Sequence, residues 1–492
     1  MKYKALLLLM LVILLASCKK KDVKLVDAQA FKDEKFEINR SLLFSKLIKY
    51  CGGERSKFHR NVAIREYYKR YGNLIWSDNF KFDKADTLIS WLKYTEADGI
   101  NQHIFHIKRE RHLINKLRNY DFKKGESITK MLAELDFLLS EDYLRYVDGM
   151  RFGFVNPESV YNNLEYIHSM VNPADSTNHR RVLFDMNIYH PDAVSDLKAL
   201  ECISSSVDGF ISASQPRNPD YNILKKELSR YRDSTSRYKI AVNMERYRWR
   251  SIQKEGYKYV WINLAQCRLY GIDRKSGNTL DMKICEGAIE HKTPVLSSQI
   301  SYMQINPYWV IPKSIVRREI IPCMQRNYNY LQKRDIEVLD HHGHKINPHS
   351  VYWNARAESI PYTFRQNSGG ENSLGRLIFR FKNNFSIFLH DTNSRWVFSS
   401  ATRTVSHGCV RLEHPVDLAW FLMKHKDNDR LQKIKYAITQ DSIKHPDTYV
   451  FSESIPLFIK YYTVYVNDKG HVVYCNDPYK YDEPLKEALK HL

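Results

Sequence analysis

Hydrophobic residues recur at three- and four-residue steps through the first half of the chain, from about residue 36 to residue 238. This spacing places them on one face of a helix. The clearest stripe consists of five residues: Leu132, Leu135, Leu139, Tyr143 and Tyr146. Asp142 and Arg145 lie off this stripe, and we expect both on the solvent side. The pattern predicts an α-helical scaffold domain over residues 36–240, whose aromatic residues are more typical of a core than of a sugar-binding surface.

The hydrophobic period changes to two after residue 241. Residues 257–263 and 268–273 alternate and are rich in aromatic and β-branched side chains, which predicts a pair of antiparallel strands. Gly277-Asn278 is a hairpin signal that follows the second of these strands. The pattern predicts a mostly-β domain over residues 241–425.

A second hairpin is predicted further along the same domain. Residues 376–381 and 385–390 are strand-like and flank Asn383-Asn384, a pair of residues typical of turns. This arrangement brings His390 to the end of a strand, where its ring is able to serve a site at the sheet edge.

Two segments do not follow the alternating pattern. Residues 312–365 are helical at first and then loop-like, with many Tyr, His and Asn residues, which predicts an insertion of helices and loops. Residues 426–492 form a C-terminal extension that we expect to pack on the mostly-β domain. Within it, residues 455–466 and 471–474 are predicted as a closing hairpin and residues 483–489 as a short helix.

The candidate chemistry centres on Cys409, in the sequence Ser406-His407-Gly408-Cys409-Val410-Arg411. A cysteine is a useful nucleophile only as a thiolate, and a neighbouring base or positive charge is what makes the thiolate accessible. His407 and Arg411 are near in sequence, and His390 is near if the predicted hairpin forms. Gly408 allows a strained turn and close approach to a substrate, which leaves backbone N–H groups free to hold an oxyanion.

The residues alone leave two other interpretations of Cys409 open. Free cysteine is among the most buried residue types, so Cys409 is also interpretable as a small core residue. His390, His407, Cys409 and His414 are all zinc-ligand types, although they lack a paired Cys-x-x-Cys or His-x-x-x-His spacing. The histidine-rich stretch at residues 340–344 also lacks a second ligand pair at a suitable spacing. We therefore predict no metal and no cofactor.

The N-terminus predicts export. Two lysines precede an apolar run over residues 5–15, which is too short to span a bilayer comfortably and has the layout of a signal peptide. Leu15-Ala16-Ser17-Cys18 resembles a bacterial lipobox, in which the cysteine becomes the lipidated first residue of the mature chain. We expect a signal peptide over residues 1–17, a charged tether over residues 18–35, and a lipid anchor on Cys18 that holds the protein to a membrane, facing the periplasm.

Composition adds limits on partners. The 492 residues carry a formal net charge of +20 and are 43% hydrophobic, which indicates several folded domains and excludes a disordered or collagenous chain. An anionic polymer is a reasonable partner for this charge. No nucleic-acid-binding motif accompanies it, so we expect no nucleic acid partner. Seven widely spaced cysteines besides Cys18 allow a free thiol and up to three disulfides: Cys51, Cys202, Cys267, Cys285, Cys323, Cys409 and Cys475.

The Ser-His-Gly-Cys-x-Arg sequence at residues 406–411, after an apolar stretch ending in His390-Asp391-Thr392, resembles the active-site signature of L,D-transpeptidases, which cross-link peptidoglycan. The resemblance extends to four other stretches: residues 307–315, 364–366, 372–376 and 413–419. Three looser stretches resemble the scaffold of the same family: residues 67–76, 98–100 and 149–157. Together they are similar to the large subfamily that has an N-terminal helical scaffold and a lid insertion in its catalytic domain.

The resemblance implies an α+β multidomain fold, with a helical scaffold before a mostly-β catalytic domain and a lid at about residues 312–365. It implies that Cys409 is the nucleophile and that His390 accepts and donates the proton, with its ring oriented by the backbone carbonyl of Asp391. The N–H groups of Gly408 and Cys409 are implied to stabilise the oxyanion. Three more residues are implied to shape the pocket or bind substrate: Ser406, His407 and Arg411.

The implied reaction has peptidoglycan stem peptides as substrates and needs no cofactor. Cys409 attacks the carbonyl that links the third stem residue to the terminal D-alanine, and a side-chain amine of a second stem then takes the acyl group in a 3→3 cross-link. Carbapenems are implied inhibitors that acylate Cys409. The same thioester serves an L,D-carboxypeptidase or an enzyme that attaches protein to peptidoglycan. A non-catalytic peptidoglycan-binding lipoprotein and a cysteine protease also remain compatible with the sequence.

The chain departs from the family pattern in two places. Many relatives carry a small peptidoglycan-binding module between segments similar to residues 215–231 and 243–249, and here only residues 232–242 separate the two. A Pro-Gly-Pro-like run of the relatives is replaced by Ser368-Gly369-Gly370-Glu371. We expect the module to be absent, so that substrate capture relies on the catalytic groove, the basic surface and the lipid anchor.

Overall fold

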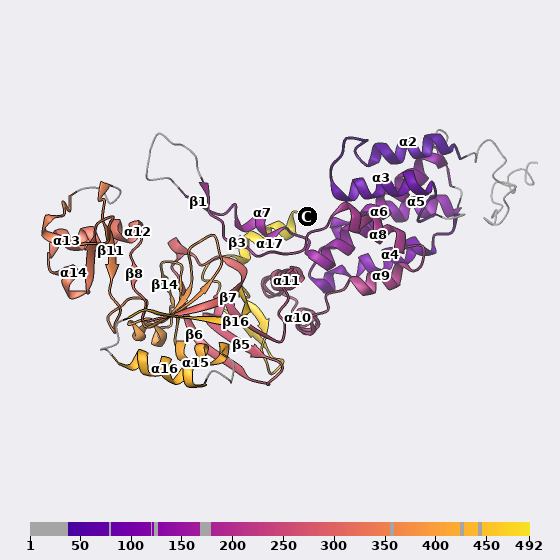
Figure 1. Ribbon diagram of the computed structural model, residues 1–492. Coiled ribbons are helices and arrows are strands. Elements are labelled where there is room, and N and C mark those ends of the chain that lie inside the picture. Colours follow the sequence, from indigo (N-terminus) through magenta and orange to yellow (C-terminus); the bar gives the residue numbers. More distant parts are fainter. Residues whose placement is uncertain are drawn as a thin grey trace, which may run out of the picture. The chain divides into compact units, whose positions relative to one another are not determined.

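A computed structural model describes most of the chain after the N-terminal segment, in the ranges 38–77, 80–119, 121–122, 126–167, 179–354, 359–423, 428–440 and 445–492. The expected signal peptide, tether and Cys18 lie outside the described residues. Within these ranges, no helix has the length and apolar character needed to cross a membrane. The chain forms two compact units (Figure 1). The helical unit contains residues up to 155, 189–250 and 486–492, and the sheet unit contains residues 156–188 and 251–485.

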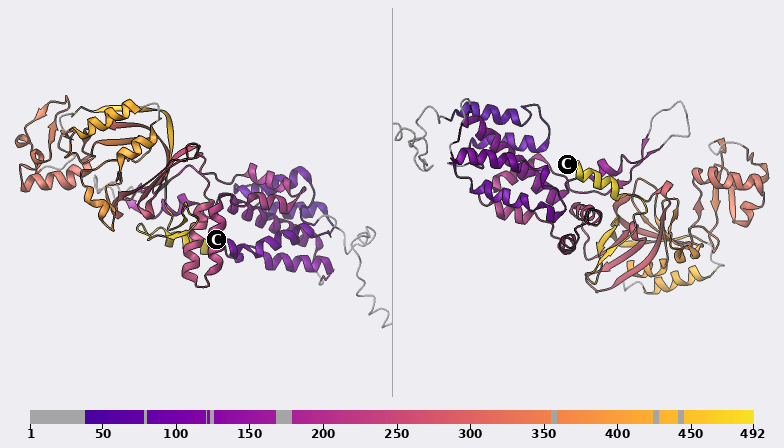
Figure 2. Two further views of the ribbon diagram at one scale, coloured as in Figure 1. Left: turned by 90° about the horizontal axis from the view of Figure 1, so that it is seen from below. Right: turned by 180° about the vertical axis from the view of Figure 1, so that it is seen from behind.

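Helix α6 (Ile128–Phe152) is the central helix of the helical unit (Figures 1 and 2). It begins at Ser127, whose side chain accepts a hydrogen bond from the Lys130 N–H, and it ends at Gly153, whose φ of 100° suits a glycine. Six other helices pack against it or its neighbours: α2 (Arg40–Tyr50), α3 (His59–Tyr71), α4 (Asp83–Lys93), α5 (Ile107–Asn119), α8 (Ala193–Cys202) and α9 (Val207–Ser214). The predicted stripe is confirmed, since each of its five side chains is at most 1% exposed.

The prediction that Asp142 faces solvent is wrong. Asp142 is fully buried, and its carboxylate lies 3.0 Å from Nδ1 of His106. Because neighbouring helices cover several sides of α6, a polar residue off the apolar stripe is also enclosed, and it requires a hydrogen-bond partner. Arg145 is only partly buried and forms an ion pair with Glu141 at 2.6 Å.

Helices α10 (Pro219–Arg230) and α11 (Ser234–Arg248) complete the helical unit as an antiparallel pair. Asn218 caps the first of them by accepting a hydrogen bond from the Asp220 N–H. Asp233 caps the second by accepting one from the Ser236 N–H. A short polar link, residues 231–233, therefore joins the two helices.

The sheet unit is built on one large sheet whose strand path closes on itself. The order is β12-β13-β15-β6-β5-β4-β16-β7-β3, and β12 also pairs with β7. Its strands are β3 (Phe184–Asp185), β4 (Lys258–Asn263), β5 (Arg268–Asp273), β6 (Thr279–Gly287), β7 (Val295–Ile305), β12 (Leu377–Phe381), β13 (Leu389–His390), β15 (Val410–Leu412) and β16 (Asp447–Lys460). The short strand β14 (Thr404–Ser406) pairs in parallel with β6. The predicted pairing of β4 with β5 and the hairpin from β5 to β6 are confirmed.

The second predicted hairpin is present but its return strand is short. β12 pairs with β13 at Ile378↔His390, so His390 does lie at a strand end. Residues 384–388 are not in the ladder, because the Asn383 side chain accepts hydrogen bonds from the Phe385 and Ile387 N–H groups and holds the segment as a loop. Ser386 has a φ of 54° in this loop, which an extended strand does not permit.

The C-terminal segment contributes to the sheet itself. β16 lies between β4 and β7, in parallel with β4 through pairs such as Leu457↔Val260 and antiparallel to β7. The predicted hairpin therefore starts later than expected and consists of β17 (Val464–Val466) and β18 (Val472–Tyr474). Helix α17 (Asp482–Lys490) corresponds to the predicted terminal helix.

The insertion expected at residues 312–365 forms a subdomain, here called the lid, that spans residues 309–366. It contains a four-stranded sheet in addition to the expected helices and loops, in the order β10 (Lys345–Ile346), β9 (Ile336–Leu339), β11 (Thr363–Gln366), β8 (Trp309–Val310). Its helical segments are α12 (Lys313–Ile315), the π-helical turn η9 (Val316–Ile320), α13 (Ile321–Arg326) and α14 (Tyr330–Lys333). Val316, Met324, Trp353 and Phe364 are among the buried residues of its own core.

Candidate active site

The register of two neighbouring strands sets the geometry of the site. β13 and β15 run in parallel, with Leu389 opposite Val410 and His390 opposite Arg411. Cys409 is the residue just before β15, so it lies beside Phe388, the residue just before β13, and His390 follows two residues further along that strand. The pairing of these strands therefore brings together residues that are separate in the sequence.

His390 is held as a neutral base. Its side chain is 4% exposed, and its Nδ1 lies 2.5 Å from the backbone carbonyl oxygen of Asp391. Because a carbonyl oxygen only accepts, Nδ1 carries the proton and Nε2 is left with its lone pair. Burial lowers the pKa of His390 to about 3, and the charge of Arg411 acts in the same direction. The imidazole is therefore unprotonated near neutral pH.

Cys409 is held as a thiol. Burial raises its pKa to about 11, and a backbone hydrogen bond from Phe388 together with the charges of Arg380 and Arg411 reduces that shift only in part. Because the pKa of the thiol is raised and that of the His390 imidazole is lowered, a thiolate–imidazolium pair is unfavourable in the resting site.

The loop before Cys409 is fixed by Ser406. The buried Ser406 hydroxyl accepts a hydrogen bond from the Gly408 N–H at 3.1 Å and donates one to the Cys409 carbonyl at 2.6 Å. In this arrangement Ser406 fixes the loop backbone, and the substrate contact expected of it stays a prediction. The Gly408 N–H, expected at the oxyanion, is already paired. The Cys409 N–H has no acceptor among the described residues and is the donor that remains available.

Thr293 forms hydrogen bonds that fix the loop of residues 406–409, here called the active loop. Its hydroxyl accepts from the Gly287 N–H at 3.0 Å and donates to the Gly408 carbonyl at 2.9 Å. Tyr479 closes the same network, accepting from the Thr293 N–H and donating to the Gly287 carbonyl. A side chain on Gly287 would meet the His291 carbonyl oxygen at 2.0 Å, so glycine is required at this position. These residues are not predicted from the sequence, because no local pattern marks them.

Two arginines supply positive charge beside the site. Arg411 forms no ion pair with any described residue, and its buried Nε has no hydrogen-bond partner. Arg380 donates to the Gln304 side chain at 3.0 Å and lies over the Phe388 ring at 4.2 Å. The motif identifies Arg411, whereas Arg380 is marked in the sequence only as one residue of an alternating strand. Both positions suit a carboxylate-bearing ligand.

The lid reaches the active loop through η9. Glu319 Oε1 lies 3.0 Å from Nε2 of His407, and the adjacent Arg318 forms a hydrogen bond with the ring of His291. The rings of His291 and His407 are stacked with centroids 5.3 Å apart. Hydrogen bonding to His407 lowers the pKa of Glu319, despite its partial burial. His407 is thus a lid contact as well as a loop residue, and no sequence pattern indicates this second role.

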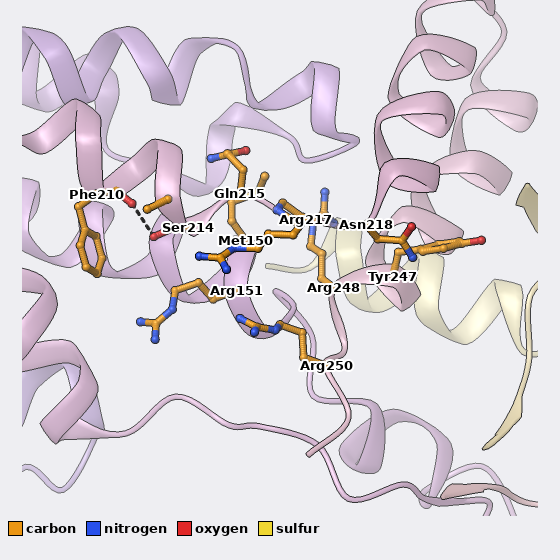
Figure 3. A pocket seen from close by; sticks show the side chains of 12 residues that line it. Met150, Arg151, Phe210, Ser214, Gln215, Arg217, Asn218, Tyr247, Arg248 and Arg250 are labelled. Carbon is orange, nitrogen blue, oxygen red and sulfur yellow. Dashed lines mark hydrogen bonds between the residues drawn. The ribbon is translucent and has the colours of Figure 1, made fainter. Parts of the chain in front are cut away.

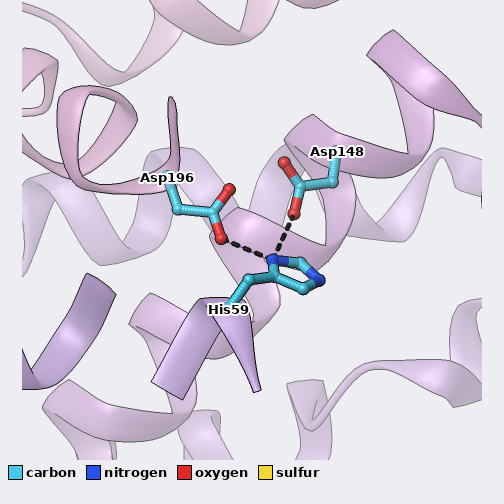
Figure 4. A group of neighbouring side chains, drawn as sticks. All are labelled: His59, Asp148 and Asp196. Atoms are coloured by element: carbon cyan, nitrogen blue, oxygen red, sulfur yellow. Dashed lines mark hydrogen bonds and ion pairs between the residues drawn. The ribbon is translucent and has the colours of Figure 1, made fainter. Parts of the chain in front are cut away.

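Among the residues that the structure describes, two clusters of metal-ligand residue types lie in the helical unit. They are His59, Asp148 and Asp196 (Figure 4), and His106, Glu141 and Asp142. His59 Nδ1 already lies 2.6 Å from Asp196, a hydrogen-bond distance shorter than two ligands of one ion normally keep. The Arg60 guanidinium lies 3.9 Å from Asp148 and supplies a positive charge there. We interpret the first cluster as a charged network inside the helical unit.

The described cysteines are all free thiols: Cys51, Cys202, Cys267, Cys285, Cys323, Cys409 and Cys475. Cys51 and Cys267 are buried, and burial raises the pKa of Cys51 to about 12. Cys409 differs from these two because its side chain is partly exposed, and the charges of Arg380 and Arg411 oppose the effect of burial on its pKa.

Comparison with known proteins adds two domain matches. Residues 257–431 match the family model of the L,D-transpeptidase catalytic domain (YkuD), and residues 62–228 match that of the scaffold domain. A curated protein of Haemophilus influenzae, named "Putative L,D-transpeptidase", is 27% identical over 257 residues, which cover 52% of this chain and 50% of that protein. The chain therefore spans about half the length of this curated relative.

Two solved structures are also similar in part. "L,D-transpeptidase from Mycobacterium smegmatis" is 14% identical, with a TM-score of 0.20, over 42% of this chain and 58% of that one. "Structure of the Ldtfm-avibactam carbamoyl enzyme" is 10% identical, with a TM-score of 0.22, over 65% of this chain and 80% of that one.

Proposed function

This chain belongs to the L,D-transpeptidase family, and we propose that it forms 3→3 cross-links in peptidoglycan with Cys409 as its nucleophile. The observation that carries the proposal is the strand register, which places His390 opposite Arg411 and so within two residues of Cys409 across the β13–β15 pair, together with the Asp391 carbonyl that holds the Nδ1 side of the His390 ring. A nucleophile next to a base that a third group orients is the arrangement required for covalent acyl transfer.

The first half-reaction forms a thioester. Sγ of Cys409 attacks the carbonyl carbon between the third stem residue and the terminal D-alanine, while the thiol proton passes to Nε2 of His390. The Cys409 N–H donates to the resulting oxyanion, a contribution of about 3 kcal/mol for a donor of this kind. The C–N bond to D-alanine then breaks, and His390 returns the proton to the leaving amine.

The second half-reaction transfers the acyl group. The side-chain amine of a second stem attacks the thioester, His390 accepts a proton from that amine, and the C–S bond breaks. The proton returns to sulfur, and the enzyme regains its thiol. The product is an amide between the third residues of two stems, and no cofactor takes part.

The protonation states support a concerted attack. The pKa of the Cys409 thiol is raised to about 11 by burial, and that of His390 is lowered to about 3 by burial. A preformed ion pair is therefore unfavourable, which supports a step in which the thiol loses its proton as the S–C bond forms. This arrangement keeps the thiol unreactive until a correctly placed substrate is bound.

Arg411 is proposed to bind a carboxylate of the donor stem. It lies opposite His390 in the β13–β15 register and has no ion-pair partner among the described residues. A guanidinium holds a carboxylate with two parallel hydrogen bonds, which orients it as well as binding it. The carboxylate of the terminal D-alanine is the group of the substrate nearest to the bond that breaks.

The same proposal includes export and anchoring. Residues 1–17 have the layout of a signal peptide, and Cys18 has the context of a lipidated cysteine. A lipid on Cys18 would hold the enzyme at a membrane, on the side where peptidoglycan is assembled.

The test is mass spectrometry of the purified chain incubated with a disaccharide-tetrapeptide, beside a Cys409→Ala control. We expect an adduct on Cys409 equal to the substrate minus D-alanine, and 3→3 dimers among the products. An adduct with tripeptide as the sole product would indicate an L,D-carboxypeptidase, and dimer formation only with an added lipoprotein amine would indicate protein attachment. Carbapenem should acylate the same cysteine. Unchanged substrate without any adduct would refute the proposal.

A further inference from the structure

The helical unit contains a pocket of about 430 Å³ that the proposed chemistry does not use (Figure 3). It is lined by the end of α6, the α9–α10 connection and the end of α11. Six of its lining residues carry guanidinium or amide donors: Arg151, Arg217, Arg248, Arg250, Gln215 and Asn218. Its size is within the range of ligand pockets.

The positive charge of this pocket is only partly neutralised. Arg248 is buried in an ion pair with Glu245 at 2.7 Å, and its Nε is buried without a hydrogen-bond partner. Arg217 and Arg250 are exposed, and neither forms an ion pair with a described residue. Guanidinium groups without paired carboxylates on one pocket favour an anionic ligand.

Arg151 contributes a third unpaired charge. It has no ion pair within the described ranges, although its charge offsets a small part of the burial that raises the pKa of Asp148. Its guanidinium also lies 4.6 Å from the centre of the Phe152 ring. The aromatic contact orients the side chain without neutralising its charge.

The other lining residues suit a peptide. Asn218 uses its carbonyl oxygen to cap α10, and its amide NH₂ has no acceptor among the described residues. Gln215 donates to the Tyr146 hydroxyl and to the Ile211 carbonyl, which leaves its carbonyl oxygen to accept from a ligand N–H. Met150 and Phe210 provide apolar surface. The pocket thus combines guanidinium groups, free amide groups and apolar contacts.

We propose that this pocket binds a peptidoglycan stem peptide through its carboxylates, as a second binding site outside the catalytic unit. The identity of the ligand rests on the proposed function. A stem peptide carries several carboxylates, backbone amides and alanine methyl groups, and each has a counterpart in the pocket. A phosphate group alone would use the arginines and leave the amides and apolar surface without a partner. Such a site would retain the substrate polymer close to the enzyme.

The test uses the full chain with Cys409→Ala, so that binding is measured without turnover. A disaccharide-tetrapeptide is titrated calorimetrically into this protein and into a version that also carries Arg217→Gln and Arg250→Gln. Both arginines are exposed, so their loss leaves the helical core intact. The matched control carries Arg111→Gln and Arg232→Gln, two exposed arginines of the same unit that do not line the pocket. Hydrogen exchange of residues 210–218 reports whether the ligand occupies the pocket.

We expect a pocket-dependent binding event at least tenfold weaker in the Arg217→Gln, Arg250→Gln protein and within twofold of the parent in the control. The tetrapeptide should slow exchange over residues 210–218, and a tetrapeptide with amidated carboxylates should not. Equal affinity in the pocket variant and control would overturn the proposal. Binding of inorganic pyrophosphate but not of tetrapeptide would also overturn it, and would indicate a phosphate site.

The outcome is separable from that of the proposed function. Release of D-alanine by the chain with Cys409 intact is measured on the same tetrapeptide. Binding at the pocket without D-alanine release would refute the proposed reaction and support the pocket as a binding site for stem peptide. D-alanine release without pocket-dependent binding would refute the pocket and leave the reaction assigned.

Discussion

Glu319 Oε1 and His407 Nε2 lie 3.0 Å apart, which joins the π-helical turn of the lid to the loop that carries Cys409. The preceding residue, Arg318, forms a hydrogen bond with His291, whose ring stacks on that of His407. Two consecutive lid side chains therefore hold two histidines at the active loop. A lid held in this way would exclude water from the thioester, and water is the competitor of the acceptor amine.

We predict that Glu319→Gln raises the ratio of hydrolysis to transfer about threefold or more. The substitution removes the charge that pairs with His407, so that the lid closes less firmly and water reaches the thioester more often. Chromatographic quantification of tripeptide against 3→3 dimer measures the ratio. Hydrogen bonding to His407 lowers the pKa of Glu319, so the contact persists below the ordinary glutamate pKa and is lost as pH falls through the lowered value.

Glu337→Gln is the matched control for this prediction. Glu337 also forms lid ion pairs, with Lys345 and Arg365 at 2.6 and 2.7 Å, and both partners belong to the lid. Its loss should leave the product ratio unchanged. Equal ratios in the wild type and Glu319→Gln would show that the contact does not control water access.

The reactivity of Cys409 should increase steeply with pH. Burial raises its pKa to about 11, so at pH 7 its thiolate fraction is roughly 100-fold lower than that of a thiol with the ordinary value of 9.0, since each unit is a factor of ten. Peptide-resolved iodoacetamide labelling measures this, with the partly exposed Cys323 as internal reference. Labelling of Cys409 that is rapid and constant from pH 6 to 9 would indicate a preformed thiolate instead.

Arg411→Met should raise the pKa of His390. Burial is the main reason for its low value of about 3, and the Arg411 charge is the second, so removing that charge favours the imidazolium. The same change should raise the pKa of Cys409 further, because Arg411 opposes the effect of burial there. NMR titration of the His390 ring tests the first statement. Arg411→Lys keeps the charge and should leave both values near those of the wild type. An unchanged titration in Arg411→Met would show that the charge has no effect on the ring.

Much of the architecture could be predicted because its signals are local. The apolar stripe that includes Leu132 and Tyr146 is a property of one helix, and the alternation in β4 and β5 is a property of one hairpin. The position of β16 could not be read in this way. Its place between β4 and β7 depends on pairing with strands far away in the sequence. The sequence of residues 447–460 does not identify β4 and β7 as the partner strands.

The active site likewise combines features that a local sequence pattern shows with features that depend on distant residues. The motif identifies Cys409 and His390 as candidate residues, because their chemical types and their spacing are visible in the sequence. The motif does not show that the Ser406 hydroxyl accepts a hydrogen bond from the Gly408 N–H, because this bond depends on the rotamer of a buried side chain. Nor does it show the contact between Glu319 and His407, which exists only when the lid folds over the loop. A sequence motif does not identify residues that position the site when those residues belong to other helices or strands.

Thr293→Val should loosen the active loop. Thr293 is fully buried, and valine has nearly the same shape without the hydroxyl that accepts from the Gly287 N–H and donates to the Gly408 carbonyl. Leaving a buried donor or acceptor unpaired costs about 1–3 kcal/mol, so the unfolding free energy should fall by about 2 kcal/mol. Denaturant unfolding measures this change. The rate of acyl-enzyme formation should fall by roughly tenfold, because Gly408 adjoins the nucleophile and a displaced loop misaligns it.

Thr293→Ser separates the hydroxyl from the methyl group. Serine keeps both hydrogen bonds and removes one buried methyl, which costs about 1 kcal/mol. If the hydroxyl positions the loop, the serine variant acylates at nearly the wild-type rate despite its lower stability, and the valine variant does not. Equal acylation rates in both variants, with equal losses of stability, would show that Thr293 only fills space. Because Thr293 is linked to Gly287 and to Gly408 through one oxygen atom, the comparison tests whether β6 determines the position of Cys409.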